Sequence, residues 1–476
     1  MTIDQSTKTA EGPPAVLGKT ASGLRIAGLA AGFVMSIVDT TVINVAGPEV
    51  QHQLGLSLAG LTWVVDGYTL TFAALLLLAG SLANRFGAKT VFLTGVTLFV
   101  LASTLCGAAP NGAALVIGRL IQGVGAALSI PSSLGLLANT FPDPKQRAKT
   151  VAIWSSISAG SAAVGPLLGG VLVGTIGWRS IFYLNIPIGI VGLLLTTRLI
   201  NPVPGRRFKP ALLGHILSIV GLAGLCFGLI EGGTFGWTSA PIIGSFVVAV
   251  VAALFFLRAE SRAPEPILPR GLFKIPRVQA INSVSFLLNL GLFGVIFMFG
   301  LFIQNARGAE PLEAGLQMLP LWGFFVVGNL TFARITGKAG TRWPMIAGLG
   351  SAAVVTLALT TISSAMPYWV LAVLIAISSL SIGVTVPAMT ASLVEAVGKE
   401  HASTAGSTLN ATRQIGTLIG VAIVGAILHG VTDWYVGATV AFLIAGVAYA
   451  ASALLAWWGT RAEESEPSPE TVAAAA

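Results

Sequence analysis

The chain has 476 residues, of which 54% are hydrophobic and only 9% are charged. A soluble domain carries about 25% charged residues, so this composition excludes a soluble globular protein and indicates a membrane protein with many spans. The net charge of +8 lies in short loops between apolar stretches, where anionic lipid rather than nucleic acid is the expected partner.

Apolar stretches follow one another along the chain, and each is long enough to cross ~30 Å of hydrocarbon as a helix. In chain order we predict fourteen membrane-spanning helices, over 25–47, 59–83, 90–109, 113–139, 148–175, 181–200, 211–231, 240–257, 278–304, 313–335, 343–362, 367–394, 404–429 and 436–458. The flanking segments 1–24 and 459–476 are polar or acidic, and we expect both to be disordered tails.

Basic residues fall almost wholly on one side of these helices. The tails and the loops that follow even-numbered helices hold 22 of the 26 Lys and Arg residues. The opposite side holds only Arg179 and Arg307, and Arg119 and Arg413 lie within helices. Positive loops stay in the cytoplasm, so we predict that both termini are cytoplasmic.

A punctuation pattern recurs after 256 residues: Pro131, Gly160 and Gly169 have counterparts at Pro387, Gly416 and Gly425. This repeat predicts two six-helix bundles, over 25–200 and 278–458, with two further helices inserted in 201–277. Paired bundles around a site near the middle of the membrane are a transporter architecture. We therefore predict an all-α polytopic membrane protein whose helices are arranged 6 + 2 + 6.

Charged residues deep inside membrane helices are expensive and therefore indicate function. Asp39, Asp66 and Arg119 all lie roughly 10 Å below the predicted outer surface, counted at ~1.5 Å per residue, so they could pair. A cation that approaches or leaves a buried carboxyl group changes its affinity for a proton, which favours a proton-coupling site. A fixed ion pair that only holds helices together is the structural alternative. Arg413 and Asn410 predict a polar site in the second bundle, structural or functional.

Residues that carry soluble-enzyme chemistry are sparse. Cys106 and Cys226 lie inside predicted helices, and the four histidines have no metal-ligand spacing. The segment 12–20 resembles a phosphate-binding loop but has five residues between its glycines where four are needed. We expect no enzyme activity, no metal and no cofactor, so uphill transport would draw on an ion gradient. The cargo is expected to be a small molecule that is hydrophobic or weakly polar. The aromatic residues proposed to contact it are Trp154, Phe293, Phe297 and Trp322, although such residues also occur in ordinary membrane cores.

Several motifs together resemble those of one known family. The first helix carries "DTTVINVAGP", with Asp39, Thr41, Asn44, Ala46 and Pro48, and the fourth carries "RLIQGVGAA" from Arg119 to Ala127. The loop "GSLANRFGAKT" includes Gly80, Asn84, Arg85, Gly87 and Lys89. The fifth helix carries "GSAAVGPLLGG", with Gly160, Gly165, Pro166, Gly169 and Gly170, and "WRSIFYLNIPIG" follows it. These motifs resemble the fourteen-span drug:proton antiporters of the major facilitator superfamily over nearly the whole chain.

The resemblance implies a major facilitator fold in a bacterial cell membrane and the export of an antibiotic-like molecule in exchange for protons. It implies that Asp39 and Arg119 take part in proton coupling and that Gly165 and Pro166 form a bend that favours exchange over leak. A metabolite or nutrient symporter, or a passive facilitator of the same fold, remains the alternative. One departure stands out: the inner-loop motif usually has Asp where this chain has Asn84, which can form hydrogen bonds but carries no charge.

Overall fold

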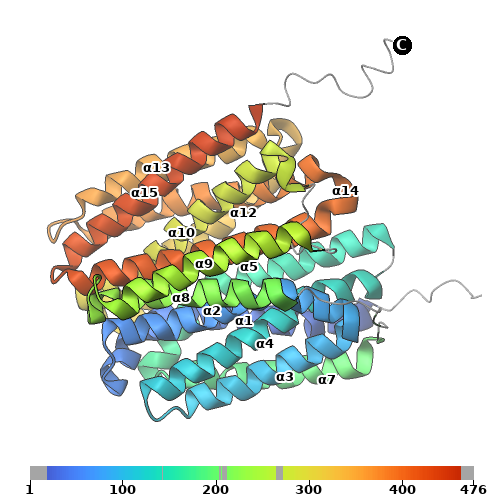
Figure 1. Cartoon of the computed structure of the whole chain (residues 1–476), viewed down its shortest axis with the longest axis horizontal. Helices are drawn as coiled ribbons and strands as arrows, with labels where there is room; N and C mark the ends of the chain where they lie inside the picture. The colour runs from blue at the N-terminus through green and yellow to red at the C-terminus, as the bar shows by residue number, and fades with distance from the viewer. Residues whose placement is uncertain (1–18, 142, 203–204, 206–211, 264–271, 462–476) are drawn as a thin grey trace, which may run out of the picture.

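The computed structural model describes residues 19–141, 143–202, 205, 212–263 and 272–461. Within these residues the chain is helical and contains no strand. Figure 1 shows the long helices lying side by side along one common direction. The predicted tails 1–24 and 459–476 lie mostly outside the described residues.

The helices in chain order are α1 (Lys19–Leu54), α2 (Leu58–Phe86), α3 (Ala88–Gly107), α4 (Gly112–Thr140), α5 (Pro144–Thr175), α6 (Ser180–Tyr183), α7 (Asn185–Leu199), α8 (Leu212–Phe235), α9 (Ala240–Arg262), α10 (Pro276–Asn305), α11 (Pro311–Gln317), α12 (Leu319–Ala339), α13 (Arg342–Ala358), α14 (Tyr368–Gly430) and α15 (Trp434–Gly459). Thirteen helical stretches among the described residues are long and apolar enough to cross a membrane. A shorter apolar helical stretch, Gly160–Thr175, belongs to α5, which has 32 residues in all. The predicted all-α membrane fold is confirmed.

Two predicted helices contain a local turn but remain single crossings, Ser180–Leu199 and Pro311–Ala339. The turn at Leu184 separates α6 from α7, and the turn at Met318 separates α11 from α12. The backbone of both residues keeps right-handed helical dihedral angles. Pro187 and Pro320 follow these turns, and a proline has no N–H to donate to the carbonyl four residues earlier.

The first helix is longer than predicted, and two other predicted helices are joined in α14. The helix α1 begins at Lys19 rather than residue 25. The helix α14 contains two crossings, Tyr368–Gly398 and Ala405–Gly430, with a non-helical Gly398 (φ 72°, ψ 170°) between them. Only glycine adopts this backbone conformation without steric cost, so Gly398 is the point at which the chain turns back.

Side-chain caps fix several helix starts. Ser57 accepts a hydrogen bond from the amide of Gly60 at the start of α2, and Asn111 accepts one from Ala114 at the start of α4. Such caps satisfy amides that have no partner in the first turn of a helix. Both caps lie at the end of the bundle that we call the predicted outer end; Gly87 and Gly398 mark the opposite, predicted inner end.

The helices pack in two groups with a hairpin beside them. Helices α1 to α7 contact one another, as do α10 to α15, and the two groups meet where α2 contacts α14, α5 contacts α11 and α1 contacts α10. Helix α8 packs against both α2 and α14, and α9 packs against α8; Figure 1 shows this pair, in green, lying along the bundle. A hydrogen bond joins the two groups: Gln304 Nε2 donates to the Val45 carbonyl oxygen at 2.9 Å. This contact lies toward the predicted outer end.

Candidate functional site

A buried polar cluster joins four helices of the first group. Asp39 on α1 and Arg119 on α4 form an ion pair, and the side chain of each is 1% exposed. Gln122 Nε2 donates to Asp39 Oδ1 at 2.8 Å, and Asn185 Nδ2 on α7 donates to the same oxygen at 3.2 Å. Gln122 Nε2 also lies 2.9 Å from Ser103 Oγ on α3. One carboxylate oxygen thus faces a cation and the other faces two amide donors, so both oxygens accept hydrogen bonds.

The guanidinium of Arg119 has partners besides Asp39. Its Nε donates to the carbonyl of Val64 on α2 at 2.8 Å, and Nη1 donates to Gln122 Oε1 at 2.8 Å. The ring of Tyr68 lies 4.6 Å from the guanidinium carbon, within the range of a cation–π contact. These partners hold the guanidinium in its buried position independently of Asp39.

Asp66 is also fully buried, but its surroundings are different. Neither carboxyl oxygen has a hydrogen-bond partner among the described residues. Asp66 lies near Cys226 of α8, and Trp63, one turn earlier on α2, donates from Nε1 to Glu231 of α8 at 2.9 Å. This face of α2 therefore points to α8, away from Arg119. Of the two carboxylates predicted at the same depth, the structure pairs Asp39 with Arg119 and leaves Asp66 apart.

The predicted polar site of the second group is less connected. Arg413 and Asn410 on α14 are half-buried, and their side chains form no hydrogen bond or ion pair within the described part of the chain. A neighbouring hydroxyl, Thr412 Oγ1, donates to Asn282 Oδ1 of α10 at 3.1 Å. Arg413 is thus a cation inside a membrane crossing without an acidic partner among the described residues, and its role stays a prediction. Across the described residues, no group of three or more His, Cys, Asp or Glu side chains is placed to hold a metal ion.

The inner-loop motif lies where α2 turns into α3. Gly87 has a φ of 88° at this joint, a value that glycine tolerates better than other residues. Lys89 Nζ donates to two carbonyl oxygens at the end of α7, at 3.0 and 2.7 Å, and a cation there is favoured by the helix dipole. Gly80 is half-buried, and Asn84 and Arg85 are exposed; the Asn84 side chain has no hydrogen-bond partner in the described ranges.

The glycines of the antiporter motif let α5 approach helices of both groups. A Cβ atom at Gly169 would lie 3.0 Å from a methyl carbon of Val42 on α1, and one at Gly170 would lie 2.7 Å from the carbonyl oxygen of Pro311 on α11. Neither space admits a side chain without displacement of a neighbour. The other motif residues lie as follows: Gly165 faces Thr41 on α1, Pro166 faces Gly315 on α11, and Gly160 faces open space. The motif is therefore part of the contact between the two groups.

The aromatic residues predicted to contact the cargo are mostly packed away. Trp154 is 6% exposed and stacks on Phe33 with ring centroids 4.4 Å apart. Phe297 and Trp322 are buried in the core of the second group, and Phe293 is half-buried against the same core. In this conformation these residues offer little open surface, and a contact with cargo stays a prediction for each.

Three members of the polar cluster were not assigned to the site from the sequence. Gln122 lies one turn after Arg119 and so shares its helix face, which was a usable signal. Asn185 and Ser103 stand in mainly apolar helices, where a buried polar side chain needs an internal partner. No sequence spacing, however, connects either of them with Asp39.

Comparisons with known proteins agree with this architecture. A sequence profile of the Major Facilitator Superfamily matches residues 29–215 and 204–421, more than half of the chain. The chain is 47% identical over 450 residues to the methylenomycin A resistance protein of Streptomyces coelicolor, with 94% of this chain and 95% of that protein covered. It is 31% identical over 433 residues to the tetracenomycin C resistance and export protein of Streptomyces glaucescens, with 89% and 80% covered. An auto-inhibited peptide transporter of the POT family shares the fold, with a TM-score of 0.67 at 13% identity, over 93% of this chain and 97% of that one.

Proposed function

Because the chain belongs to the major facilitator superfamily, we propose that it exports a small antibiotic-like molecule across a bacterial cell membrane in exchange for protons. The resistance and export proteins to which it is similar support the class of cargo. The observation that carries the proton coupling is the buried Asp39–Arg119 pair, completed by Gln122 and Asn185. The excess of basic residues on one side of the helices supports a topology with both termini in the cytoplasm.

The proton step follows from the charges in the cluster. A proton that binds Asp39 neutralises the carboxylate and removes its attraction for Arg119, while the Val64 carbonyl and the Tyr68 ring keep the guanidinium in place. Loss of the proton restores the ion pair. Binding of a proton therefore changes how strongly α1 is held to α4, and this is the link through which protonation can bias the arrangement of the helices.

Asp66 is proposed to be a second protonation site. A buried carboxylate without a partner costs several kcal/mol, whereas the neutral acid costs much less. Asp66 has no described partner and faces α8, so we assign it the protonated form in this conformation. The two acids thus hold different protonation states at similar depth, and cargo or a conformational change would have to exchange these states for the cycle to run.

Alternating access is proposed as the mode of transport. The contacts of Gly170 with Pro311 and of Gln304 with Val45 tie the two helix groups together toward the predicted outer end. These contacts belong to a conformation that is closed to the outside. Rocking of the groups about the central helices would break them and open the site outward.

The test uses inside-out membrane vesicles prepared from a host that expresses this chain and lacks its own drug pumps. An imposed proton gradient should drive uptake of the cargo, identified from a panel of toxic compounds, and collapse of the gradient should stop it. Asp39→Asn should reduce uptake to the level of vesicles without the protein. Asp433→Asn is the matched control, because Asp433 is exposed and caps α15, and asparagine caps a helix equally well.

The alternative functions give different results in this assay or in intact cells. Uptake that continues unchanged after collapse of the gradient would indicate a passive facilitator. Accumulation of the compound in intact cells rather than its expulsion would indicate a symporter. Normal gradient-driven uptake by Asp39→Asn would contradict the role assigned to Asp39 while leaving export itself intact.

A further inference from the structure

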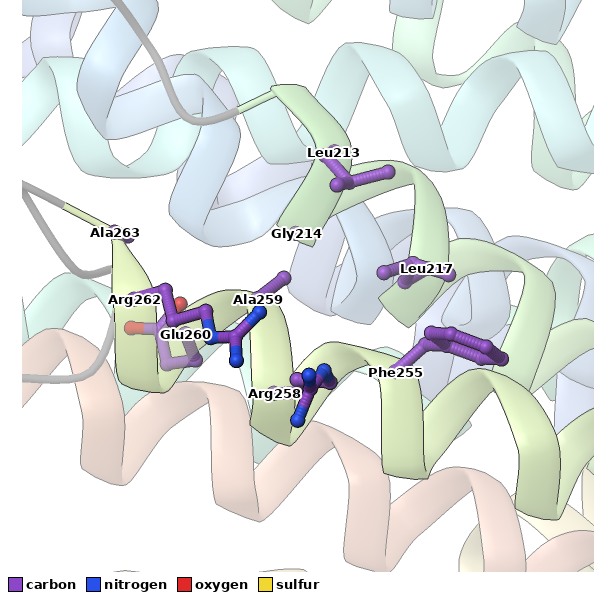
Figure 2. Close-up of a pocket in the computed structure, with 9 residues that line it drawn as sticks. All are labelled: Leu213, Gly214, Leu217, Phe255, Arg258, Ala259, Glu260, Arg262 and Ala263. Atoms are coloured by element: carbon purple, nitrogen blue, oxygen red, sulfur yellow. The ribbon is translucent and has the colours of Figure 1, made fainter.

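A cavity of about 520 Å³ lies between α8 and α9, the hairpin inserted between the two helix groups. It is lined by the last turns of α9 and the first turns of α8 and so belongs to the predicted inner end. Figure 2 shows Leu213 and Leu217 projecting from α8 on one side, and Phe255, Arg258 and Arg262 projecting from α9 on the other. The cavity is remote from the Asp39 cluster, which lies within helices α1, α3, α4 and α7.

The cavity presents basic groups that the fold does not use. Arg258 and Arg262 are four residues apart and therefore share one face of α9. Both are exposed, and neither guanidinium forms a hydrogen bond or ion pair with another described residue. Glu260 also lines the cavity but is only 7% exposed. With two guanidiniums and one carboxylate, the lining has a net charge of +1.

The apolar part of the lining is continuous with a surface that faces lipid. Leu213 is 62% exposed and Phe255 is 57% exposed. Helix α9 has a mean hydropathy of 2.6, yet only 11% of its apolar window is buried in the protein. An apolar helix that the protein does not cover is covered by acyl chains in a membrane. A molecule in this cavity would therefore have an anionic group beside the arginines and a hydrocarbon part along α8 and α9.

We propose that this cavity is a binding site for an anionic glycerophospholipid of the inner leaflet, with the headgroup phosphate on Arg258 and Arg262 and an acyl chain against Leu213, Leu217 and Phe255. Arginine matches phosphate with a planar fork of donors, and basic pockets between helices on the cytoplasmic side of a membrane suit such headgroups. A free phosphate ion would use the arginines but not the apolar wall, so the lipid is the occupant that uses the whole lining.

The test is a lipid titration of the purified, full-length protein in neutral detergent, followed by native mass spectrometry. Phosphatidylglycerol is the probe, phosphatidylcholine is the zwitterionic comparison, and glycerol phosphate is the headgroup without chains. Arg258→Gln/Arg262→Gln should weaken phosphatidylglycerol binding by about 30-fold, the factor expected for two basic residues near the membrane surface. Ala259→Trp, which fills the cavity without altering its charge, should weaken binding as well.

The matched control is Arg334→Gln/Lys338→Gln on α12. This pair is also exposed, four residues apart and at the predicted inner end, so it should leave lipid binding unchanged. Equal loss in the control would show that general surface charge holds the lipid and would overturn the proposal. Unchanged binding by Ala259→Trp, equal affinity for phosphatidylcholine, or full displacement by glycerol phosphate would overturn it as well.

Discussion

The stability of the Asp39–Arg119 pair can be tested by a double-mutant cycle. Asp39→Asn leaves a fully buried guanidinium without its counter-charge, and Arg119→Gln leaves a buried carboxylate without its cation. Breaking a buried ion pair from one side costs about 3–5 kcal/mol. We expect about 3 kcal/mol for each single variant, the low end, because Val64 and Gln122 still bind Arg119, and Gln122 still donates to Asp39.

The double variant Asp39→Asn/Arg119→Gln removes both charges at once. The large cost of breaking a buried pair comes from the charge that is left without its partner, and the double variant leaves no such charge. We therefore expect a loss of no more than about 3 kcal/mol, where independent sites would sum to about 6 kcal/mol. The free energy of unfolding would be measured by denaturant titration in detergent micelles at neutral pH, with tryptophan fluorescence as the signal. Transport should be absent in all three variants, although the double variant should lose less stability than the two single variants lose together.

A coupling energy near zero would refute the reasoning. If the losses of the two single variants add within about 0.5 kcal/mol, the two side chains do not interact as an ion pair. Unchanged stability of Asp39→Asn alone would mean that Asp39 already carries its proton when Arg119 is buried beside it. The protonation states proposed for Asp39 and Asp66 would then have to be exchanged.

Three further variants test other parts of the site. Asp66→Asn should change the free energy of unfolding by no more than about 1 kcal/mol while abolishing gradient-driven export; a gain of several kcal/mol would instead reveal an ionised Asp66 in the native protein. Gly170→Leu should separate α5 from α11 at an overpacking cost of about 1–3 kcal/mol, and a cysteine placed at the buried Leu301 should then react faster with a membrane-impermeant maleimide; unchanged labelling would contradict the outer contact. Lys89→Met should destabilise the protein by about 1 kcal/mol through the loss of the cation at the end of α7, and Lys89→Arg should restore most of it in thermal unfolding.

Sequence reasoning worked best where one physical rule decides the outcome. The length and apolarity of the stretches decide that they are helices, because lipid offers the backbone no other partners. Depth was also readable: Asp39 and Arg119 were placed at one level by counting residues, and the structure joins them. The local turns at Leu184 and Met318 were not predicted, because the hydropathy pattern runs through Pro187 and Pro320 without a change.

Direction around a helix axis was much harder to predict than depth. Asp66 shares the level of Asp39, but its side chain points from α2 toward α8, and no local pattern in an apolar helix distinguishes one neighbour from another. The same problem explains why Asn185 was not assigned to the site: its side chain binds Asp39, which lies 146 positions earlier in the chain. The cavity between α8 and α9 was not predicted either, since a cavity depends on how two helices cross and not on the composition of either one.

Helix α8 touches both α2 and α14, and this double contact constrains any rocking motion. Helix α8 cannot keep its contacts with both helix groups while the two groups rotate relative to each other. The Trp63–Glu231 hydrogen bond anchors α8 to α2. Sliding is therefore expected between α8 and α14, where Gly233 of α8 lies against the ring of His429. The α8–α9 hairpin is thus expected to move together with the first helix group. The contact of Gly233 with α14, which lacks a side chain on the α8 side, is where α8 would slide over the second group.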